Sequence, residues 1–236
     1  MVKGIVAASV LLVLCGTIAW GGYRLSKSRK YQLLGELVTR VETSDMVVAL
    51  TFDDGPVPAY TDSVLAVLAE FKAHATFFMV GSAIRNNPDI AARVLEQGHE
   101  IGNHSFSHAQ LILKRPSYVS REIEDTDALI RALGYEGEIY VRPPYAKRLL
   151  VLPLYLRNHD RPVVLWDLEP DTYHRKTDGV VRYVNEHVRP GSIILLHVEI
   201  PSRVQNRAAL PRILSDLQER GYRFVTLSQL MALRAS

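Results

Sequence analysis

Two adjacent carboxylates, Asp53 and Asp54, follow an apolar run that ends at Gly55-Pro56. Such a run predicts a buried strand that stops where the Gly-Pro pair begins. Carboxylates this close repel each other unless a proton or a cation lies between them. A polar turn uses the same residue types, because Asp, Gly and Pro all favour turns. The pair alone therefore allows either a turn or a metal site.

His104 and His108 lie four residues apart, downstream of the carboxylates. This spacing predicts two imidazoles on one face of a helical turn, within reach of one ion. Such a pair alone is also typical of a polar surface, but Asp54 is expected at a strand end of the same sheet. Two imidazoles and one carboxylate leave coordination positions open, as catalytic metal sites do. We predict that Asp54, His104 and His108 hold one divalent metal ion, zinc by preference, with cobalt or another transition metal as alternatives.

Further polar residues are expected around the same pocket. Asp53 would lie beside the ion and could take a proton from water that the ion activates. His197 follows an apolar run and could protonate a leaving nitrogen; a buried histidine bonded to backbone is the alternative. Arg142 ends the fourth strand and Asp171 follows the fifth, so we expect a buried pair between them that keeps Asp53 ionised and oriented. A solvated surface pair, which contributes little, is the alternative.

These positions require strands that end side by side, and the apolar pattern supplies seven. The strands are expected at residues 47–52, 75–80, 99–103, 139–142, 162–166, 192–197 and 222–227. Helices are expected at residues 61–72, 87–97, 118–133, 178–188 and 208–220, with a last short one capped by Ser228. Strands that alternate with helices predict an α/β fold with a largely parallel sheet. Seven such strands indicate a closed or nearly closed (β/α) barrel.

Length and composition limit the classes of protein that remain. The chain has 236 residues, of which 47% are hydrophobic and 22% charged, and this excludes a mainly disordered protein. Its net charge of +3 is only mildly basic, and much of the excess lies near the apolar N-terminus. A membrane surface therefore explains the charge better than nucleic acid does. The single cysteine, Cys15, excludes an internal disulfide framework and a cysteine-based zinc site.

The N-terminal region reads as a membrane segment. Residues 4–22 carry no charge, and as a helix they would rise about 28 Å, close to the thickness of a hydrocarbon core. A cleaved signal peptide is the main alternative, because Thr17, Ile18 and Ala19 loosely resemble a cleavage site. We expect an anchor or signal segment at residues 1–25 and a connector at residues 26–45, partly helical around residues 31–41. A catalytic domain is expected at residues 46–233.

Four segments together carry a resemblance to a known family. Residues 51–56 (TFDDGP), 104–108 (HSFSH), 142–145 (RPPY) and 195–197 (LLH) occur in the order and rough spacing of the polysaccharide deacetylases. This group is also called the NodB-homology group or carbohydrate esterase family 4. The similarity covers about residues 47–230. It implies a distorted (β/α) barrel, in agreement with the strand count.

The resemblance also implies roles for the motif residues. Asp53 resembles the catalytic base and His197 the catalytic acid, and the metal ligands are Asp54, His104 and His108. Arg142 resembles the arginine that orients the base. Tyr145 stands where the family uses a backbone N–H to hold the oxyanion.

The sequence departs from the family pattern at three places. Ala146 stands where a glycine is common, and Val198-Glu199 replaces a frequent Asp-Gly-like turn. The usual Asp-Trp ending of the fifth strand is replaced by residues 166–173 (WDLEPDTY). The partner of the arginine therefore remains open between three carboxylates, Asp171, Asp167 and Glu169.

The resemblance implies metal-dependent removal of N-acetyl groups from an amino-sugar glycan such as peptidoglycan or a chitin-like chain. Two alternatives are a deformylase or amide hydrolase acting on a lipid-linked amino sugar, and a membrane-tethered glycan-binding module without turnover. The expected partners are the glycan and the membrane, with no nucleic acid and no obligate protein partner.

Two arguments about the membrane orientation of the anchor disagree. The cations after the apolar segment favour a cytoplasmic domain by the positive-inside rule. Polymeric amino-sugar glycans, however, lie outside the bacterial cytoplasmic membrane. We expect a single-pass membrane protein whose catalytic domain is extracytoplasmic.

Overall fold

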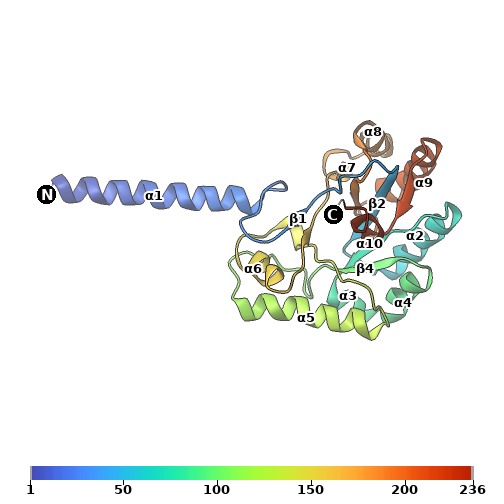
Figure 1. Ribbon diagram of the computed structural model, residues 1–236, viewed down its shortest axis with the longest axis horizontal. Coiled ribbons are helices and arrows are strands. Elements are labelled where there is room, and N and C mark those ends of the chain that lie inside the picture. The colour runs from blue at the N-terminus through green and yellow to red at the C-terminus, as the bar shows by residue number, and fades with distance from the viewer. Residues whose placement is uncertain (1, 235–236) are drawn as a thin grey trace.

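The computed structural model describes residues 2–234 and shows an α/β fold whose strands are mainly parallel (Figure 1). The strands are β1 (Leu37–Val38), β2 (Val47–Asp53), β3 (Thr76–Met79), β4 (Glu100–Asn103), β5 (Val163–Val164), β6 (Ile193–Leu196) and β7 (Arg223–Val225). The helices are α1 (Val2–Ser26), α2 (Pro58–Glu70), α3 (Gly81–Asn86), α4 (Pro88–Glu96), α5 (Pro116–Ala132), the 3₁₀ helix η1 (Pro144–Ala146), α6 (Val151–Arg157), α7 (Pro170–Tyr173), α8 (Thr177–His187), α9 (Val204–Glu219) and α10 (Leu227–Met231).

Strand β2 is the centre of the sheet. It pairs in parallel with β3, β6 and β7, and β4 extends the sheet beyond β3. A second sheet consists of β1 and β5, and single parallel bridges at Val141 and Leu168 connect it towards β4 and β6. The carboxyl ends of these strands therefore meet on one side, where pockets of α/β folds lie.

Alternation along β2 decides which side chains face the helices. Val48, Leu50 and Phe52 belong to one core cluster with side chains of α2, α4, α8 and α9. Val47 and Ala49 belong to the other cluster, which includes residues of α5 and the chain around β5. Because successive strand residues point to opposite faces, Asp53 shares the second face with Val47 and Ala49. All seven residues of β2 are buried, as expected of a strand that is covered on both sides.

Several details of the predicted elements are wrong. Residues 31–41 do not form a helix; they contribute β1, which pairs with β5, and Val41 is buried. The expected strand at residues 139–142 is reduced to bridges at Val141, since Pro143 and Pro144 end it. Thr226, and not Ser228, caps α10, because Thr226 and Gln229 form a reciprocal capping box.

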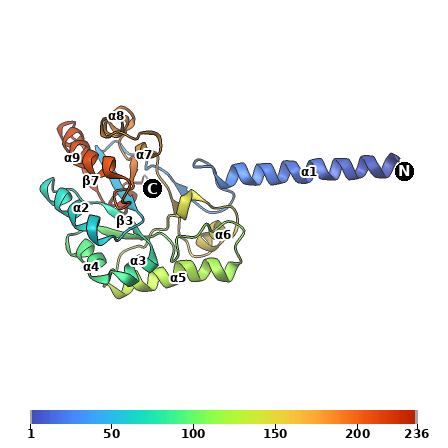
Figure 2. The same ribbon diagram turned by 180° about the vertical axis from the view of Figure 1, so that it is seen from behind.

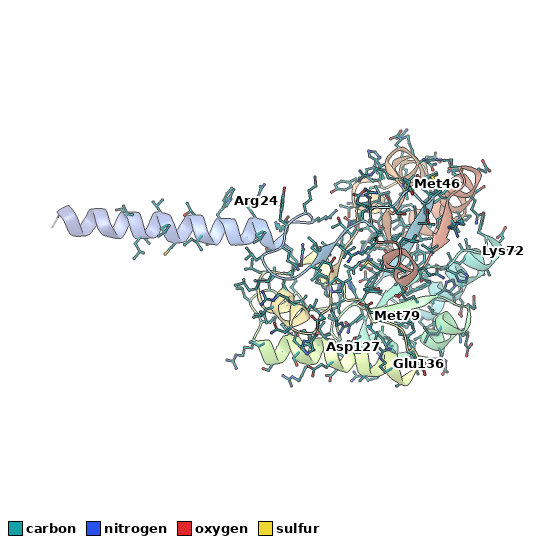
Figure 3. The ribbon with its side chains drawn as sticks, in the orientation of Figure 1. Arg24, Met46, Lys72, Met79, Asp127 and Glu136 are labelled. Atoms are coloured by element: carbon teal, nitrogen blue, oxygen red, sulfur yellow. The ribbon has the colours of Figure 1, made fainter. Side chains whose placement is uncertain are left out.

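Helix α1 projects away from the globular part as a single long element, as Figures 1 and 2 show from opposite sides. Its side chains from residue 9 onward are largely exposed, including Leu12, Val13 and Ile18. Arg24 marks the end of the helix that approaches the globular part (Figure 3). By length and composition the stretch Ser9–Ser26 is apolar enough to cross a membrane.

Candidate active site

The three predicted metal ligands lie together. Asp54 Oδ1 is 3.0 Å from His108 Nε2 and 3.5 Å from His104 Nε2. One donor atom from each residue lies within 4.8 Å of the others. Tetrahedral zinc with bonds of about 2.0–2.1 Å separates its donor atoms by about 3.3 Å. The donor set and its spacing therefore fit a small divalent ion.

The two histidines come together through a loop and not through a helical turn. Residues 104–108 are irregular, and both Ser105 and His108 have positive φ angles of 63° and 57°. The backbone N–H groups of Phe106 and Ser107 donate to the buried carboxylate of Glu122 on α5, which takes the place of intrahelical bonds. The i, i+4 spacing therefore gives the expected convergence by a different local structure.

The ring of His104 is fixed by its second nitrogen. Nδ1 lies 2.8 Å from the carbonyl oxygen of Arg142, to which it donates. This bond leaves Nε2 as the nitrogen that faces Asp54, which is the arrangement of a metal-ligating histidine. Burial lowers the pKa of His104, but the charges of Asp53 and Asp54 outweigh it and raise the pKa overall.

Asp53 is held by a buried guanidinium. Arg142 is completely buried, and its Nη1 donates to Asp53 Oδ1 at 2.7 Å and to Thr51 Oγ1 at 2.9 Å. Nη2 donates to the carbonyl of Leu165, and the guanidinium carbon lies 4.0 Å from the ring centre of Phe78. Burial lowers the pKa of Arg142 and the charge of Asp53 opposes this. The charge-assisted bond fixes the carboxylate beside the metal ligands.

The predicted pair between Arg142 and Asp171 is wrong, because Asp171 contacts His197. Its Oδ2 lies 2.8 Å from His197 Nδ1 and accepts the backbone N–H of His197 at 3.1 Å. Asn206 on α9 donates to the same oxygen at 2.6 Å. Asp171 lies in α7 beyond β5, so it approaches the end of β6 while Arg142 reaches back to β2.

This pairing sets the charge of His197. Burial by itself lowers the pKa of His197. The hydrogen bond and the charge of Asp171, aided by the charges of Asp53 and Asp54, raise this pKa to about 9. At neutral pH His197 is therefore an imidazolium that can give up a proton.

The other two carboxylates considered as partners of Arg142 have different contacts. Asp167 accepts from Ser192 Oγ and from the backbone N–H of Ile193, both at 2.8 Å. Glu169 lies 2.5 Å from Arg29, although its charge also acts on Arg142. Neither carboxylate contacts the guanidinium of Arg142 directly. Among the described residues, this guanidinium forms a salt bridge with Asp53 alone.

Tyr145 lies at the mouth of the site. The residue is 58% exposed, and the centre of its ring is 4.7 Å from that of the His108 ring. Tyr145 and Ala146 both have positive φ angles, 59° and 57°. This left-handed backbone explains why a glycine is common where Ala146 stands.

Glu199 and Asn206 belong to the site's surroundings but were not predicted as such. Glu199 is buried and accepts from the Thr61 hydroxyl at 3.0 Å and the Val57 N–H at 3.1 Å. Burial raises the pKa of Glu199 to about 8. Its carboxylate packs directly against Gly55, whose added Cβ would lie 1.7 Å from Oε2. The position of Glu199 two residues after His197, within the motif region, could have indicated that it lies near the site. No motif in the sequence includes Asn206.

These groups combine the elements of a hydrolytic site. A carboxylate fixed by arginine lies next to the three predicted metal ligands, and His197 is paired with its own carboxylate. This set can remove a proton from water and deliver a proton to a leaving group, which is the chemistry of amide or ester hydrolysis.

Comparisons with known proteins agree with this chemistry. The family model described as polysaccharide deacetylase matches residues 40–161. A peptidoglycan-N-acetylglucosamine deacetylase of Bacillus cereus is 34% identical over 84% of this chain and 93% of its own length. A chitooligosaccharide deacetylase of Sinorhizobium fredii is 35% identical over 81% of this chain and 95% of its own length.

A solved structure shows a similar arrangement in space. The crystal structure of a peptidoglycan N-acetylglucosamine deacetylase with a bound benzamide compound superposes with a TM-score of 0.77. It is 30% identical in sequence and covers 82% of this chain and 92% of its own. The similarity therefore extends over nearly all of the globular part.

Proposed function

Because the chain belongs to the polysaccharide deacetylase family, we propose that it removes N-acetyl groups from an amino-sugar glycan by metal-dependent hydrolysis. The chain is a hydrolase of the deacetylase class, and amino-sugar glycans are the substrates named for its relatives. Peptidoglycan and chitin-like oligosaccharides are the two substrates that we propose to test first.

Asp54, His104 and His108 would hold the metal ion. The support is the convergence of their donor atoms and the Nδ1 bond of His104, which leaves Nε2 free for coordination. A bound Zn²⁺ or Co²⁺ would act as a Lewis acid and lower the pKa of a water molecule to about 7.

Asp53 would take the proton from the attacking water. Its carboxylate is buried, paired with Arg142, and adjacent to the proposed metal ligands, with Oδ2 3.7 Å from His104 Nε2. Arg142 acts through Asp53, so we propose it as a positioning residue. The attack on the amide carbonyl carbon places negative charge on the carbonyl oxygen, for which the backbone N–H of Tyr145 is the proposed donor.

His197 would complete the reaction by giving its proton to the nitrogen of the departing amine. The raised pKa supports this role, because an acid must still carry its proton when the C–N bond breaks. Asp171 would keep Nδ1 protonated and bonded, which leaves Nε2 as the nitrogen that delivers the proton.

One observation carries this proposal, namely the base, metal ligands and acid brought together from three segments of the chain. The full-length protein in detergent, loaded with zinc, should release acetate from N-acetylated chitooligosaccharide or peptidoglycan. The matched control is the Asp53→Asn protein at equal metal content. Absence of acetate with every substrate, from folded and metal-loaded protein, would contradict the proposal.

We further propose that α1 anchors a catalytic unit at residues 46–233 on the outer side of a membrane, through the connector at residues 26–45. The support is the apolar stretch Ser9–Ser26 and the cell-wall substrates named for relatives. Alkaline phosphatase and a cytoplasm-active reporter, each fused after Ser236, would report the topology. Activity of the cytoplasmic reporter alone would reverse the proposed orientation.

A further inference from the structure

The segment that follows α1 contacts residues beside the proposed catalytic groups. A guanidinium nitrogen of Arg29 is 2.5 Å from Glu169 Oε2, and its central carbon is 5.1 Å from the ring centre of Trp166. Glu169 is only 6% exposed, and apart from the Arg29 contact its Oε2 has no hydrogen-bond partner among the described residues. Arg29 therefore supplies the direct counter-charge to a carboxylate that the fold has removed from water.

The next residues of the segment hold a second buried charge. Arg148 is 2% exposed, and it donates through Nε to Gln32 Oε1 at 2.8 Å and through Nη2 to the carbonyl of Tyr31 at 3.3 Å. Its remaining bond goes to the carbonyl of Ala146 at 3.0 Å. Burial lowers the pKa of Arg148 to about 10. Residues 31–32 thus supply two of the three hydrogen bonds of a buried guanidinium.

The residues that Arg29 contacts lie next to the residues that hold the proposed base and acid. Trp166, on which Arg29 lies, is also 5.3 Å from the guanidinium carbon of Arg142, the residue that holds the base. Glu169 is two residues before Asp171, the residue that holds the acid. A shift of the chain at Glu169 would therefore be transmitted over a very short length of backbone to Asp171.

The Arg148 contact connects the same segment to the loop that carries Tyr145. Arg148 binds the carbonyl of Ala146, which directly follows the proposed oxyanion residue Tyr145. Both of these loop residues have left-handed backbone, a conformation that needs support from its surroundings. The hydrogen bonds that Arg148 donates to residues 31–32 give that support from outside the loop.

We propose that residues 29–32 form a strap that positions two active-site loops, the loop carrying Glu169 and Asp171 and the loop carrying Tyr145. This inference rests on the proposed deacetylase function. Arg29 and Gln32 are the positioning side chains, and they act through Glu169 and Arg148 respectively. In this proposal, the segment that follows α1 supports the geometry of the active site.

The strap also connects the loop that carries Glu169 to the end of α1. Only Lys27 and Ser28 separate Arg29 from the last residue of the helix, Ser26. Three residue steps span at most about 11 Å, so the loop at Glu169 is kept close to the end of the apolar helix. A cleavage after Ala19 would leave the strap in place, because residues 29–32 lie downstream.

The test uses the full-length, zinc-loaded protein in detergent, with acetate release from chitooligosaccharide as the assay. Arg29→Ala should lower kcat about tenfold with KM nearly unchanged, because residues that support an active group contribute about 10–100-fold. Lys30→Ala is the matched control, since it removes a neighbouring cation whose side chain is exposed. It should leave kcat at the wild-type value.

A second substitution separates positioning from a general loss of structure. Adding Glu169→Gln to Arg29→Ala removes the unpaired buried charge, so kcat should recover to within about threefold of wild type. Gln32→Ala tests the other arm and should lower kcat in the same direction, since Arg148 loses its best-placed acceptor.

The outcomes are distinguishable. An inactive wild-type protein refutes the proposed function itself. With an active wild type, equal kcat values for Arg29→Ala and Lys30→Ala overturn the strap. A rise in KM with kcat unchanged also overturns it, because Arg29 would then contact the substrate. Failure of Glu169→Gln to restore kcat does the same.

Discussion

Replacing Asp171 by asparagine removes the charge beside His197 while it keeps the shape and an acceptor oxygen. In the wild-type protein Asp171 opposes the effect of burial, and the pKa of His197 is raised to about 9 from an ordinary value of 6.5. Without that charge, burial dominates, and we expect the pKa to fall to 6.5 or below. The imidazole would then be neutral over most of the physiological pH range.

The expected size of the effect follows from the two pKa values. At pH 7.5 a group with a pKa of about 9 is about 97% protonated, whereas one with a pKa of about 6.5 is about 9% protonated. A reaction that needs the imidazolium should therefore lose at least about tenfold in kcat/KM at pH 7.5. The loss should shrink as the pH is lowered towards 6.

The assay is the pH profile of acetate release, which reports the ionisation of the free enzyme through kcat/KM. The basic limb should move from near pH 9 in the wild type to about pH 6.5 or below in Asp171→Asn. Asp167→Asn is the matched control, because Asp167 is a nearby, partly buried carboxylate that accepts hydrogen bonds from Ser192 and Ile193 instead. A basic limb that stays near pH 9 in Asp171→Asn would refute the assignment of His197 as an acid charged by Asp171.

The same pair should be visible in stability. A pKa raised on folding adds stability that is fully present below the unfolded value of 6.5 and is lost as the pH rises through about 9. The wild-type melting temperature should therefore fall over this window, and the fall should be smaller in Asp171→Asn. Equal pH dependence in both proteins would show that the pair does not stabilise the fold.

Three further predictions concern the base, the metal and the packing of the loop. Asp53→Asn should lower kcat by about 10²–10⁴-fold with the metal still bound, as determined by acetate release and elemental analysis; substantial turnover would exclude Asp53 as the base. His108→Ala should reduce bound zinc below one ion per chain, and activity lost on chelation should return in the wild type, but not in the variant, when stoichiometric zinc is added. Gly55→Ala should destabilise the fold by about 1–3 kcal/mol, because the added Cβ would lie 1.7 Å from Glu199 Oε2. An unchanged denaturation midpoint would mean that the Glu199 side chain can move aside.

Local pattern was enough to predict most of the strands and to identify the side chains that lie together after them. The apolar run before Asp53 and Asp54 predicts a strand whatever it pairs with, and β2 is observed at Val47–Asp53. Parallel strands bring their carboxyl ends to one edge, so His104 after β4 and His197 after β6 were expected near Asp54. The spacing of the histidines mattered more than the structure between them, since a loop brings the same two side chains to Asp54.

The pairing of charges required the tertiary structure. The sequence offers Asp53, Asp171, Asp167 and Glu169 as partners for Arg142, and nothing in their local pattern distinguishes them. The choice depends on strand register and on the path of α7, which carries Asp171 to His197 and leaves Arg142 to Asp53. Asn206 on α9 enters the site for the same reason, through helix packing.

The region after α1 shows most clearly what the sequence alone does not predict. By composition, residues 26–45 read as a polar connector, and local propensity predicted a partial helix there. In the fold, β1 pairs with β5, and Arg29 and Gln32 contact buried charged side chains of distant segments. Sequence periodicity records which face of an element is apolar. It does not record which unpaired strand edge or buried charge a polar segment will meet, because that partner exists only once the rest of the chain has folded.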